Sequence, residues 1–217
     1  MFDAATARRM MVDGQVRTAD VTDLDLIAAM EAVPRELFVP PALAGQAYSD
    51  GDIALGSGRA LLKPMILAKL IQAAGVGPGD HVLDVGCATG YSSAVLSRLA
   101  GSVVALEQDA SLAQRAREAL AAAGAAQVTV ATGSLTAGWP AAAPYDVIFL
   151  NGSTEIVPEA LGKQLRPNGR LACVFGRAPI GRATIFREIE GQLAGRPVFD
   201  AAAAVLPGFV APPAFVF

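Results

Sequence analysis

The chain has 217 residues, of which 53% are hydrophobic and 17% charged, and its formal net charge at pH 7 is -3. This composition is typical of an ordered globular protein with one sizeable core, and it excludes an intrinsically disordered chain. The 17 basic residues are scattered along the sequence instead of forming a stripe. We therefore expect no nucleic-acid partner.

Two long uncharged stretches, residues 119–145 and the residues after Asp200, are interrupted by prolines and glycines, so neither predicts a membrane span. The N-terminus has an acid near its start and no apolar run before a cleavage site. No secretion signal is expected, and we place the protein in the cytoplasm. Cys87 and Cys173 adjoin apolar runs without metal-ligand spacing, which predicts reduced, buried thiols and no metal site.

The first 60 residues are expected to form an extension of helices and loops. Thr22 followed by Asp25 resembles a helix cap. The apolar residues of the helix that would follow are Leu24, Ile27, Ala28, Met30 and Ala32. That helix should end in the proline-containing stretch "VPRELFVPP", before a glycine-rich passage at 45–58. Pro64 then suits the first turn of a helix that ends near residues 75–79.

From residue 81, strand-like and helix-like runs alternate, which is typical of a parallel sheet with crossover helices. The strand-like runs are 81–85, 103–107, 127–131, 145–150 and 170–175, and the helix-like runs are 91–99, 109–123 (with Asp109 as N-cap) and 157–165. Two further strands are predicted at 182–189 and 196–206. The fold class is therefore α/β and Rossmann-like, with helices on both faces of a mostly parallel sheet. We expect a single domain, with its core in 61–176 and C-terminal strands in 177–217.

Glycines recur between the first strand and the next helix, in the stretch "HVLDVGCATGYSSAVLS". Residues 86–90 form a strand-to-helix turn, which brings backbone N–H groups and a helix N-terminus close to a ligand. Asp84 precedes this turn, and Glu107 ends the next strand. Because the carboxyl ends of parallel strands share one edge of the sheet, both acids should face the same ligand. Glu107 could there accept hydrogen bonds from both hydroxyls of a ribose.

The turn lacks the G-x-G-x-x-G pattern of a dinucleotide site and has an acid two residues before its first glycine. Asp84 would repel a pyrophosphate and attract an amino group. A positively charged sulfonium beside an amino acid, as in S-adenosyl-L-methionine, suits these charges better than NAD does.

The stretch "VLDVGCATGYSSAVL" resembles the first motif of the S-adenosylmethionine-dependent methyltransferases, in the form used by the protein-L-isoaspartate O-methyltransferase family. The resemblance extends over "AMEAVPRELFVP", "AYSDGDIALGSGRALLKP" and "PYDVIFLNGSTEIVPEALGKQLRPNGRLACVFG", and it ends near Gly176. It implies a Rossmann-like methyltransferase fold with S-adenosyl-L-methionine as cofactor. The implied cofactor-binding residues are Leu61, Asp84, Gly86, Cys87, Ala88, Gly90, Glu107, Gln108, Ser134, Leu135 and Asn151, with Glu107 at the ribose and Ser134 and Leu135 beside the adenine.

The chain departs from the family pattern before the first strand of the sheet. The family has G-Q-T-I-S-Q-P where this chain has "GRALLKP" at 58–64, so Ala60 and Leu62 replace both hydroxyls. The residues expected next to the substrate are Arg59, Ala60, Leu62 and Lys63, and no catalytic residue is assigned. Arg59 and Lys63 are either solvated loop cations or attract a different acid. Two further departures are Ser134 in place of an aspartate and Ala88 in place of a glycine.

The resemblance implies methyl transfer to a carboxylate, nominally an L-isoaspartyl residue in a damaged protein, as part of a repair cycle. A carboxylate is already an ionised nucleophile at neutral pH, so positioning and exclusion of water suffice, without a general base. Two alternatives stay open: methylation of another acid, and a non-catalytic cofactor-binding sensor or assembly protein. The expected partner is a protein or peptide with an acceptor carboxylate, without a membrane. The sequence leaves monomer and dimer open.

Three other features have simple structural interpretations. His81 begins a strand and has no nearby ligand partner, so a structural role is expected. Trp139 either packs under a loop or lines the adenine pocket. The C-terminal "LPGFVAPPAFVF" is interpreted as an edge strand or a cover over the domain, with a partner-binding tail as the alternative.

Overall fold

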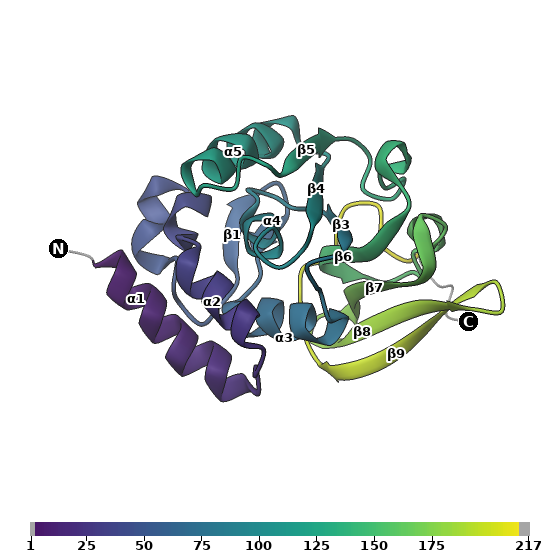
Figure 1. The fold of residues 1–217 in the computed structure, drawn as a ribbon, viewed down its shortest axis with the longest axis horizontal. Coiled ribbons are helices and arrows are strands. Elements are labelled where there is room, and N and C mark those ends of the chain that lie inside the picture. The colour runs from purple at the N-terminus through teal and green to yellow at the C-terminus, as the bar shows by residue number, and fades with distance from the viewer. Residues whose placement is uncertain (1–2, 213–217) are drawn as a thin grey trace.

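A seven-stranded sheet forms the centre of the molecule (Figure 1). The structure is a computed structural model, and it describes residues 3–212. The strand order is β5-β4-β3-β6-β7-β8-β9; the first five pair in parallel, and β8 and β9 add antiparallel neighbours. The strands are β3 (His81–Val85), β4 (Ser102–Glu107), β5 (Thr129–Thr132), β6 (Tyr145–Thr154), β7 (Leu165–Arg177), β8 (Ile180–Ile189) and β9 (Gln192–Asp200). The predicted α/β class with a mostly parallel sheet is confirmed.

The strands predicted from apolar runs are present, but several have different limits. β3 has the predicted bounds, and β5 begins two residues later than expected, at Thr129. β6 continues past Leu150 to Thr154 through a register irregularity between Phe149 and Ser153. This extension brings Asn151 and Ser153 to the carboxyl edge of the sheet, where the sequence analysis expects a ligand.

The helices are α1 (Ala4–Met11), α2 (Leu24–Ala32), α3 (Pro64–Ala74), α4 (Tyr91–Leu96), α5 (Ala110–Ala122) and α6 (Glu159–Gly162), with short helical turns η1 (Val12–Val16), η2 (Arg17–Ala19), η3 (Arg35–Phe38), η4 (Pro41–Gln46) and η5 (Pro140–Ala142). As predicted, Pro64 is the first residue of α3, and Gly75 ends it in the left-handed region at φ 62°. Asp109 caps α5 as expected. The helix predicted at 157–165 is wrong in length, because α6 spans four residues and β7 already begins at Leu165.

One expectation for the N-terminal extension is wrong, and a second, which correctly includes Ile27 and Met30, is wrong in part. Asp23, not Thr22, caps α2, because its carboxylate accepts hydrogen bonds from the backbone N–H groups of Asp25 and Leu26. The buried face of α2 is Leu26, Ile27, Ala29 and Met30, whereas Leu24 is 73% exposed and Ala28 and Ala32 are also exposed. The extension also leads into an antiparallel hairpin of two strands, β1 (Ile53–Gly56) and β2 (Arg59–Leu61).

The two faces of the sheet are covered differently (Figure 1). Helices α2 to α5 and the N-terminal residues bury one face in a large hydrophobic cluster. The other face is covered by residues 133–143, by α6 and by the C-terminal segment, which contributes Leu206 and Phe209. This second cover brings residues near the C-terminus into the region of the glycine turn.

The C-terminal segment leaves the sheet earlier than predicted. The strand expected at 196–206 ends at Asp200, and the chain then returns along β6, where Val205 forms an isolated parallel bridge with Ser153. Backbone hydrogen bonds join Ser153 to Ala204 and Leu206. Phe209 is 1% exposed, so residues up to this point cover the domain. The last five residues of the Phe-rich end, 213–217, lie outside the described residues.

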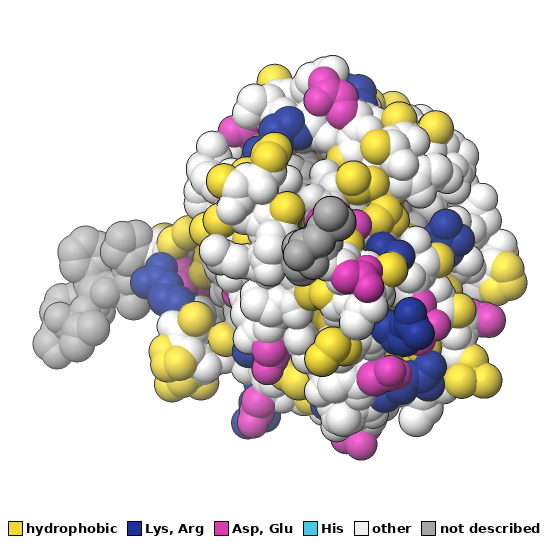
Figure 2. Space-filling model, turned by 90° about the vertical axis from the view of Figure 1, so that its left-hand side faces the viewer, with side chains coloured by type: hydrophobic (Ala, Val, Ile, Leu, Met, Phe, Trp, Pro, Cys, Tyr) yellow, Lys and Arg dark blue, Asp and Glu magenta, His cyan; other side chains and the backbone are white. Residues whose placement is uncertain are grey.

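The face that carries the N-terminal helices has acidic and basic side chains side by side (Figure 2). In the described part of the chain, no helix is long and apolar enough to cross a bilayer. His81 has the structural role expected of it: its ring nitrogens lie 2.6 Å from the Ser102 hydroxyl and 2.9 Å from the Ala142 carbonyl, and its ring stacks on Tyr145.

Candidate active site

Asp84 lies completely buried at the end of β3, next to the glycine turn. Its Oδ2 atom accepts hydrogen bonds from two hydroxyls in the first turn of α4, Ser92 at 2.6 Å and Ser93 at 2.5 Å. Asn151, on the extension of β6, donates to the Ser92 hydroxyl at 2.9 Å. Three elements therefore fix the orientation of this carboxyl group.

The other oxygen of Asp84, Oδ1, is buried and has no hydrogen-bond partner among residues 3–212. Burial raises the pKa of Asp84 to about 6, against the lowering effects of Ser92, Ser93 and the nearby charge of Arg59. A buried carboxylate oxygen without a partner is costly unless a ligand satisfies it. Asp84 thus presents one free acceptor beside the turn.

Glu107 ends β4 and is also completely buried. Its Oε1 atom accepts hydrogen bonds from the backbone N–H groups of Gln108 and Asp109, at 2.9 and 3.2 Å. Its Oε2 atom accepts from the backbone N–H of Ala88 at 2.8 Å and from the guanidinium of Arg59 at 3.1 Å. The two acids that the sequence analysis placed at one edge of the sheet are therefore both at the turn.

Arg59 is not a solvated loop cation, which corrects one of the two interpretations of the sequence. It is 4% exposed and forms a buried ion pair with Glu107. The same nitrogen, Nη2, also donates to the carbonyl of Gly86. Lys63, its neighbour in the 58–64 segment, is only partly exposed, and its backbone N–H donates to Asp52 at 2.8 Å. Of the two cations, Arg59 alone reaches the acids.

The turn between β3 and α4 has three residues in the left-handed region of backbone space: Gly86 at φ 75°, Ala88 at 51° and Gly90 at 92°. Ala88, which stands where the resembling family has a glycine, thus keeps a glycine-like conformation despite its Cβ. This conformation points its N–H at Glu107. A Cβ at Gly86 would lie 2.6 Å from Nη2 of Arg59 and 3.2 Å from the methyl carbons of Leu206. Two side chains of this chain therefore pack directly onto the turn.

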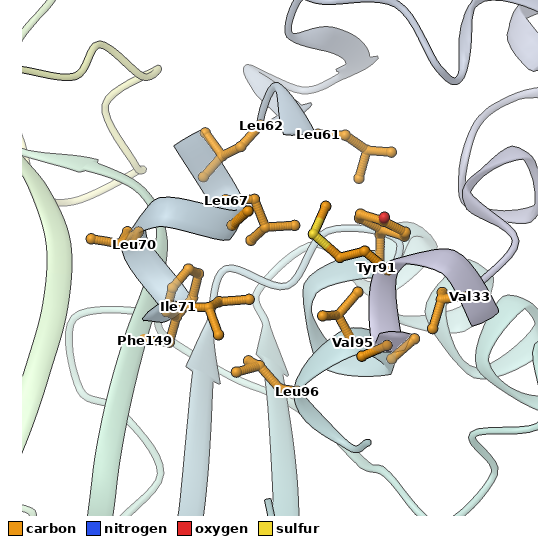
Figure 3. Close-up of a cluster of buried hydrophobic side chains, with 14 of the residues drawn as sticks. Val33, Leu61, Leu62, Leu67, Leu70, Ile71, Tyr91, Val95, Leu96 and Phe149 are labelled. Carbon is orange, nitrogen blue, oxygen red and sulfur yellow. The ribbon is translucent and has the colours of Figure 1, made fainter. Parts of the chain in front are cut away.

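Residues 60–62, which replace the family's two hydroxyl residues, lie partly on the β1–β2 hairpin and partly in the hydrophobic core. Leu61 and Leu62 are 1% and 4% exposed, and Figure 3 shows them with Leu67 and Tyr91 in a cluster of buried hydrophobic side chains. Ala60 is partly exposed on β2. Hence only Ala60 and Lys63 of the four expected substrate-side residues keep exposed surface.

The remaining candidates lie around the same edge of the sheet. The backbone N–H of Cys87 donates to the Leu106 carbonyl at 3.1 Å, and burial raises the pKa of its thiol. Ser134 is exposed, with its hydroxyl 3.1 Å from that of Thr136, and Leu135 is buried. Both cysteines are free and buried, as predicted. Trp139 packs against the hydrophobic cluster that contains Leu206 and Phe209, and its ring lies near Gly133.

Sequence reasoning missed four residues of this region. Ser92 and Ser93 carried a signal, because hydroxyls in the first turn after a glycine turn can reach the preceding strand end. Arg35, inside the quoted "VPRELFVP" motif, is fully buried; it donates to the carbonyls of Ala47 and Leu62 and stacks on the Tyr91 ring. Leu206 gave no signal, since its position depends on the return of the C-terminal segment.

Comparison with known proteins gives the same family as the motifs in the sequence. The sequence model of the family "Protein-L-isoaspartate(D-aspartate) O-methyltransferase (PCMT)" matches residues 7–193. The chain belongs to this family. A protein-L-isoaspartate O-methyltransferase from Methylorubrum extorquens (strain PA1) is 45% identical over 185 residues, which are 85% of this chain and 80% of the relative. The resemblance inferred from the motifs is thus confirmed, and members of the family use S-adenosylmethionine as methyl donor.

Solved structures agree on the fold. One protein-L-isoaspartate O-methyltransferase superposes with a TM-score of 0.79 at 24% identity, covering 93% of this chain and 66% of that chain. A second, described as a putative protein-L-isoaspartate O-methyltransferase from Plasmodium falciparum in complex with S-adenosyl-L-homocysteine, has a TM-score of 0.79 at 17% identity, covering 92% of this chain and 97% of that chain. The methyltransferase fold expected from the family resemblance is confirmed.

The residues of this chain fit the family's methyl donor in two respects. The free, buried Oδ1 of Asp84 can accept a hydrogen bond from an amino group. Gly86 has no Cβ on the side of the turn that Arg59 and Leu206 cover, so a ligand that displaces these side chains can approach its backbone closely. Among the described residues, no group of three or more His, Cys, Asp or Glu side chains could hold a metal ion.

Proposed function

We propose that this chain transfers a methyl group from S-adenosyl-L-methionine to a carboxylate, nominally that of an L-isoaspartyl residue in a damaged protein. The observation that carries the proposal is the pair of buried carboxylates, Asp84 and Glu107, on either side of a left-handed glycine turn. Family membership and the 45% identical relative support the same reaction.

In this proposal, each residue at the turn has a defined role. The ionised Asp84 accepts a hydrogen bond from the amino group of the donor, with its orientation held by Ser92, Ser93 and Asn151. Glu107 accepts hydrogen bonds from the ribose hydroxyls, beside Gln108. The left-handed turn and the N-terminus of α4 approach the methionine part. When bound, the donor supplies an electrophilic methyl group on a sulfonium.

Further candidates complete the proposed donor site. Gly86, Cys87, Ala88 and Gly90 surround the methionine part through their backbone, and Leu61 lies behind it. Ser134 and Leu135 lie on the chain after β5, where we propose that they flank the adenine. Ser134 is exposed and lacks a carboxylate, so a contact with the adenine amino group depends on its single hydroxyl.

The acceptor needs no general base from this chain. A carboxylate is ionised at neutral pH, so the protein has to align it with the methyl group and keep water away. The cover formed by Val205, Leu206 and Phe209 over the second face of the sheet supports exclusion of water. The proposed substrate side consists of the surface around Ala60 and Lys63, with Arg59 and Leu62 buried beneath it.

One observation favours a second candidate, the methylation of a different acid. The 60–62 segment carries no hydroxyl, and the Leu62 side chain belongs to the core. An acceptor that the family orients through side-chain hydroxyls would lose those contacts here. Loss of one hydrogen bond to a charged group changes a rate or equilibrium by about 10- to 150-fold.

Two measurements test the proposal together. Calorimetry with S-adenosyl-L-homocysteine should show binding to the purified full-length chain, and labelled methyl should be transferred to an isoaspartyl peptide but not to its aspartyl counterpart. Binding with transfer only to other carboxylates would support the second candidate. Binding without any transfer would point to a non-catalytic sensor, and absence of binding would reject the methyltransferase proposal.

We further propose that the chain acts as a single cytoplasmic domain, as a monomer or a dimer, on protein or peptide substrates and not on nucleic acid. Two free, buried thiols are what a reducing compartment maintains, which supports the location. The net charge of -3 supports a partner other than nucleic acid. Size-exclusion chromatography with light scattering determines the oligomeric state.

A further inference from the structure

Arg59 binds the carboxylate that the proposed function assigns to the ribose of the methyl donor. Its Nη2 atom lies 3.1 Å from Oε2 of Glu107, and the side chains are 3% and 0% exposed. Away from water, an ion pair of this kind is held by charge and hydrogen bonding together. In the proposed function the ribose hydroxyls need the Glu107 carboxylate, which the Arg59 guanidinium already occupies.

Glu107 has no free acceptor site for a further hydroxyl. A carboxylate offers about four lone-pair sites. In this structure Gln108, Asp109 and Ala88 each donate a backbone N–H to it, and Arg59 is the fourth donor. The three backbone donors lie directly after β4 and in the glycine turn, so they are held by the main chain on either side of Glu107. Only the Arg59 side chain can leave without a change of fold, and its departure frees one acceptor site of Glu107 for a ribose hydroxyl.

The guanidinium also fills the space directly above the turn. It donates to the carbonyl of Gly86, and a Cβ at this glycine would lie 2.6 Å from Nη2. Glycine at φ 75° otherwise exposes its backbone to close approach by a ligand. The side chain thus blocks two contacts of the proposed donor at once, one at the turn and one at Glu107.

Arg59 is held at this place incompletely, next to an exposed hairpin turn. Its Nε atom is buried and has no acceptor among residues 3–212, which lowers the stability of the closed arrangement. Residue 59 follows the exposed hairpin turn 56–58, where Gly56, Ser57 and Gly58 all have positive φ. The guanidinium can therefore reach solvent by a change in its own rotamer and in this turn, without unpacking the helices.

We infer that Arg59 sets the affinity of the donor site, because its guanidinium competes with the donor's ribose for Glu107 and has to leave before the donor binds. This inference rests on the proposed function and adds a built-in competitor to it. The family pattern has glutamine at this position, so Arg59→Gln replaces the competitor with a neutral side chain that the fold accommodates.

The test uses calorimetric titration of the purified full-length chain with S-adenosyl-L-homocysteine, a ligand that binds without turnover. Arg59→Gln should bind it about 10-fold more tightly than the wild type, the effect of removing one charged hydrogen bond from competition. Arg59→Lys keeps the charge but not the planar fork, and it should gain less. Without ligand, Arg59→Gln should melt at a lower temperature, because Glu107 loses its counter-ion.

The matched control is Arg182→Gln, which removes an ion pair of an arginine that is 64% exposed on β8, to Asp200, and should leave the affinity unchanged. Equal or weaker binding by a folded Arg59→Gln would overturn the inference and leave the proposed function standing. If Arg59→Gln fails to fold, an Arg59→Lys affinity no higher than that of the wild type overturns it instead. If neither the wild type nor any variant binds the ligand, both the inference and the proposed function fail.

Discussion

Asn151 donates a hydrogen bond from Nδ2 to the hydroxyl of Ser92 at 2.9 Å, and that hydroxyl donates its only proton to Asp84. The amide on the β6 extension thus fixes the rotor of a serine on α4, which in turn fixes a carboxyl group on β3. Because the second oxygen of Asp84 has no partner among the described residues, this chain of hydrogen bonds presents one acceptor in a defined direction.

The contribution of Asp84 to the stability of the wild type should fall as the pH rises from about 4 to about 6. Burial raises the pKa of Asp84 from 3.8 to about 6 in the folded state. A raised carboxyl pKa favours folding while the group is protonated. The contribution is therefore complete below pH 3.8 and is lost between there and pH 6, by roughly 3 kcal/mol at 1.36 kcal/mol per pH unit.

Urea unfolding of the wild type and of Asp84→Asn at several pH values measures this effect. The variant stays neutral, so it should equal the wild type near pH 4 and exceed it above pH 6. Asp200→Asn, at a side chain 90% exposed, is the control and should change the free energy of unfolding little. An Asp84→Asn variant that is less stable than the wild type at pH 8 would contradict the raised pKa of Asp84.

Donor affinity should depend on pH with the opposite sign. In the proposed function the donor's amino group needs the ionised form of Asp84, whose pKa is about 6 in the folded protein. Affinity for S-adenosyl-L-homocysteine should therefore be constant above pH 7 and fall by up to about 10-fold per pH unit below pH 6. Calorimetry from pH 5 to 8 measures it. A flat profile across this range would remove Asp84 from the donor contacts.

The part of the site on β3 and β4 could be predicted because it follows local rules. An apolar strand, an acid and a glycine turn are contiguous in sequence, and parallel strands bring their carboxyl ends to one edge. Asp84 and Glu107 therefore lie where the sequence places them, although 23 residues separate them. The N-cap at Asp109 and the first helical residue Pro64 are equally local and were also predicted.

The burial of Arg59 could not be predicted, because its partner Glu107 is 48 residues away and belongs to a different element. An arginine beside glycines in a polar loop is usually solvated, and only the hairpin of β1 and β2 turns it inward. Leu206 is a similar case: its place above Gly86 depends on the return of the C-terminal segment along β6. The short α6 escaped prediction because its apolar residues also suit a longer helix.

Ala88→Gly should change the free energy of unfolding by less than about 1 kcal/mol. Ala88 has φ 51°, where a Cβ costs about 1 to 2 kcal/mol, and the relief is offset by the greater freedom of glycine in the unfolded chain. Ala119→Gly, inside α5, is the matched control and should cost about 1 kcal/mol or more. Chemical denaturation of both variants compares them, and a larger loss at Ala88 than at Ala119 would contradict the strain argument.

Leu62→Ser, which restores a family hydroxyl, should destabilise the fold by about 3 kcal/mol or more. The Leu62 side chain is 4% exposed in the cluster of Figure 3, so a serine there leaves a cavity and places a hydroxyl among apolar side chains. Ala60→Thr restores the other hydroxyl on a partly exposed strand position and should cost less than about 1 kcal/mol. Urea denaturation separates the two variants, and methyl transfer to an isoaspartyl peptide shows which hydroxyl matters. Any gain in transfer should appear with Ala60→Thr; a gain confined to Leu62→Ser at unchanged stability would mean that residue 62 can turn out of the core toward the substrate.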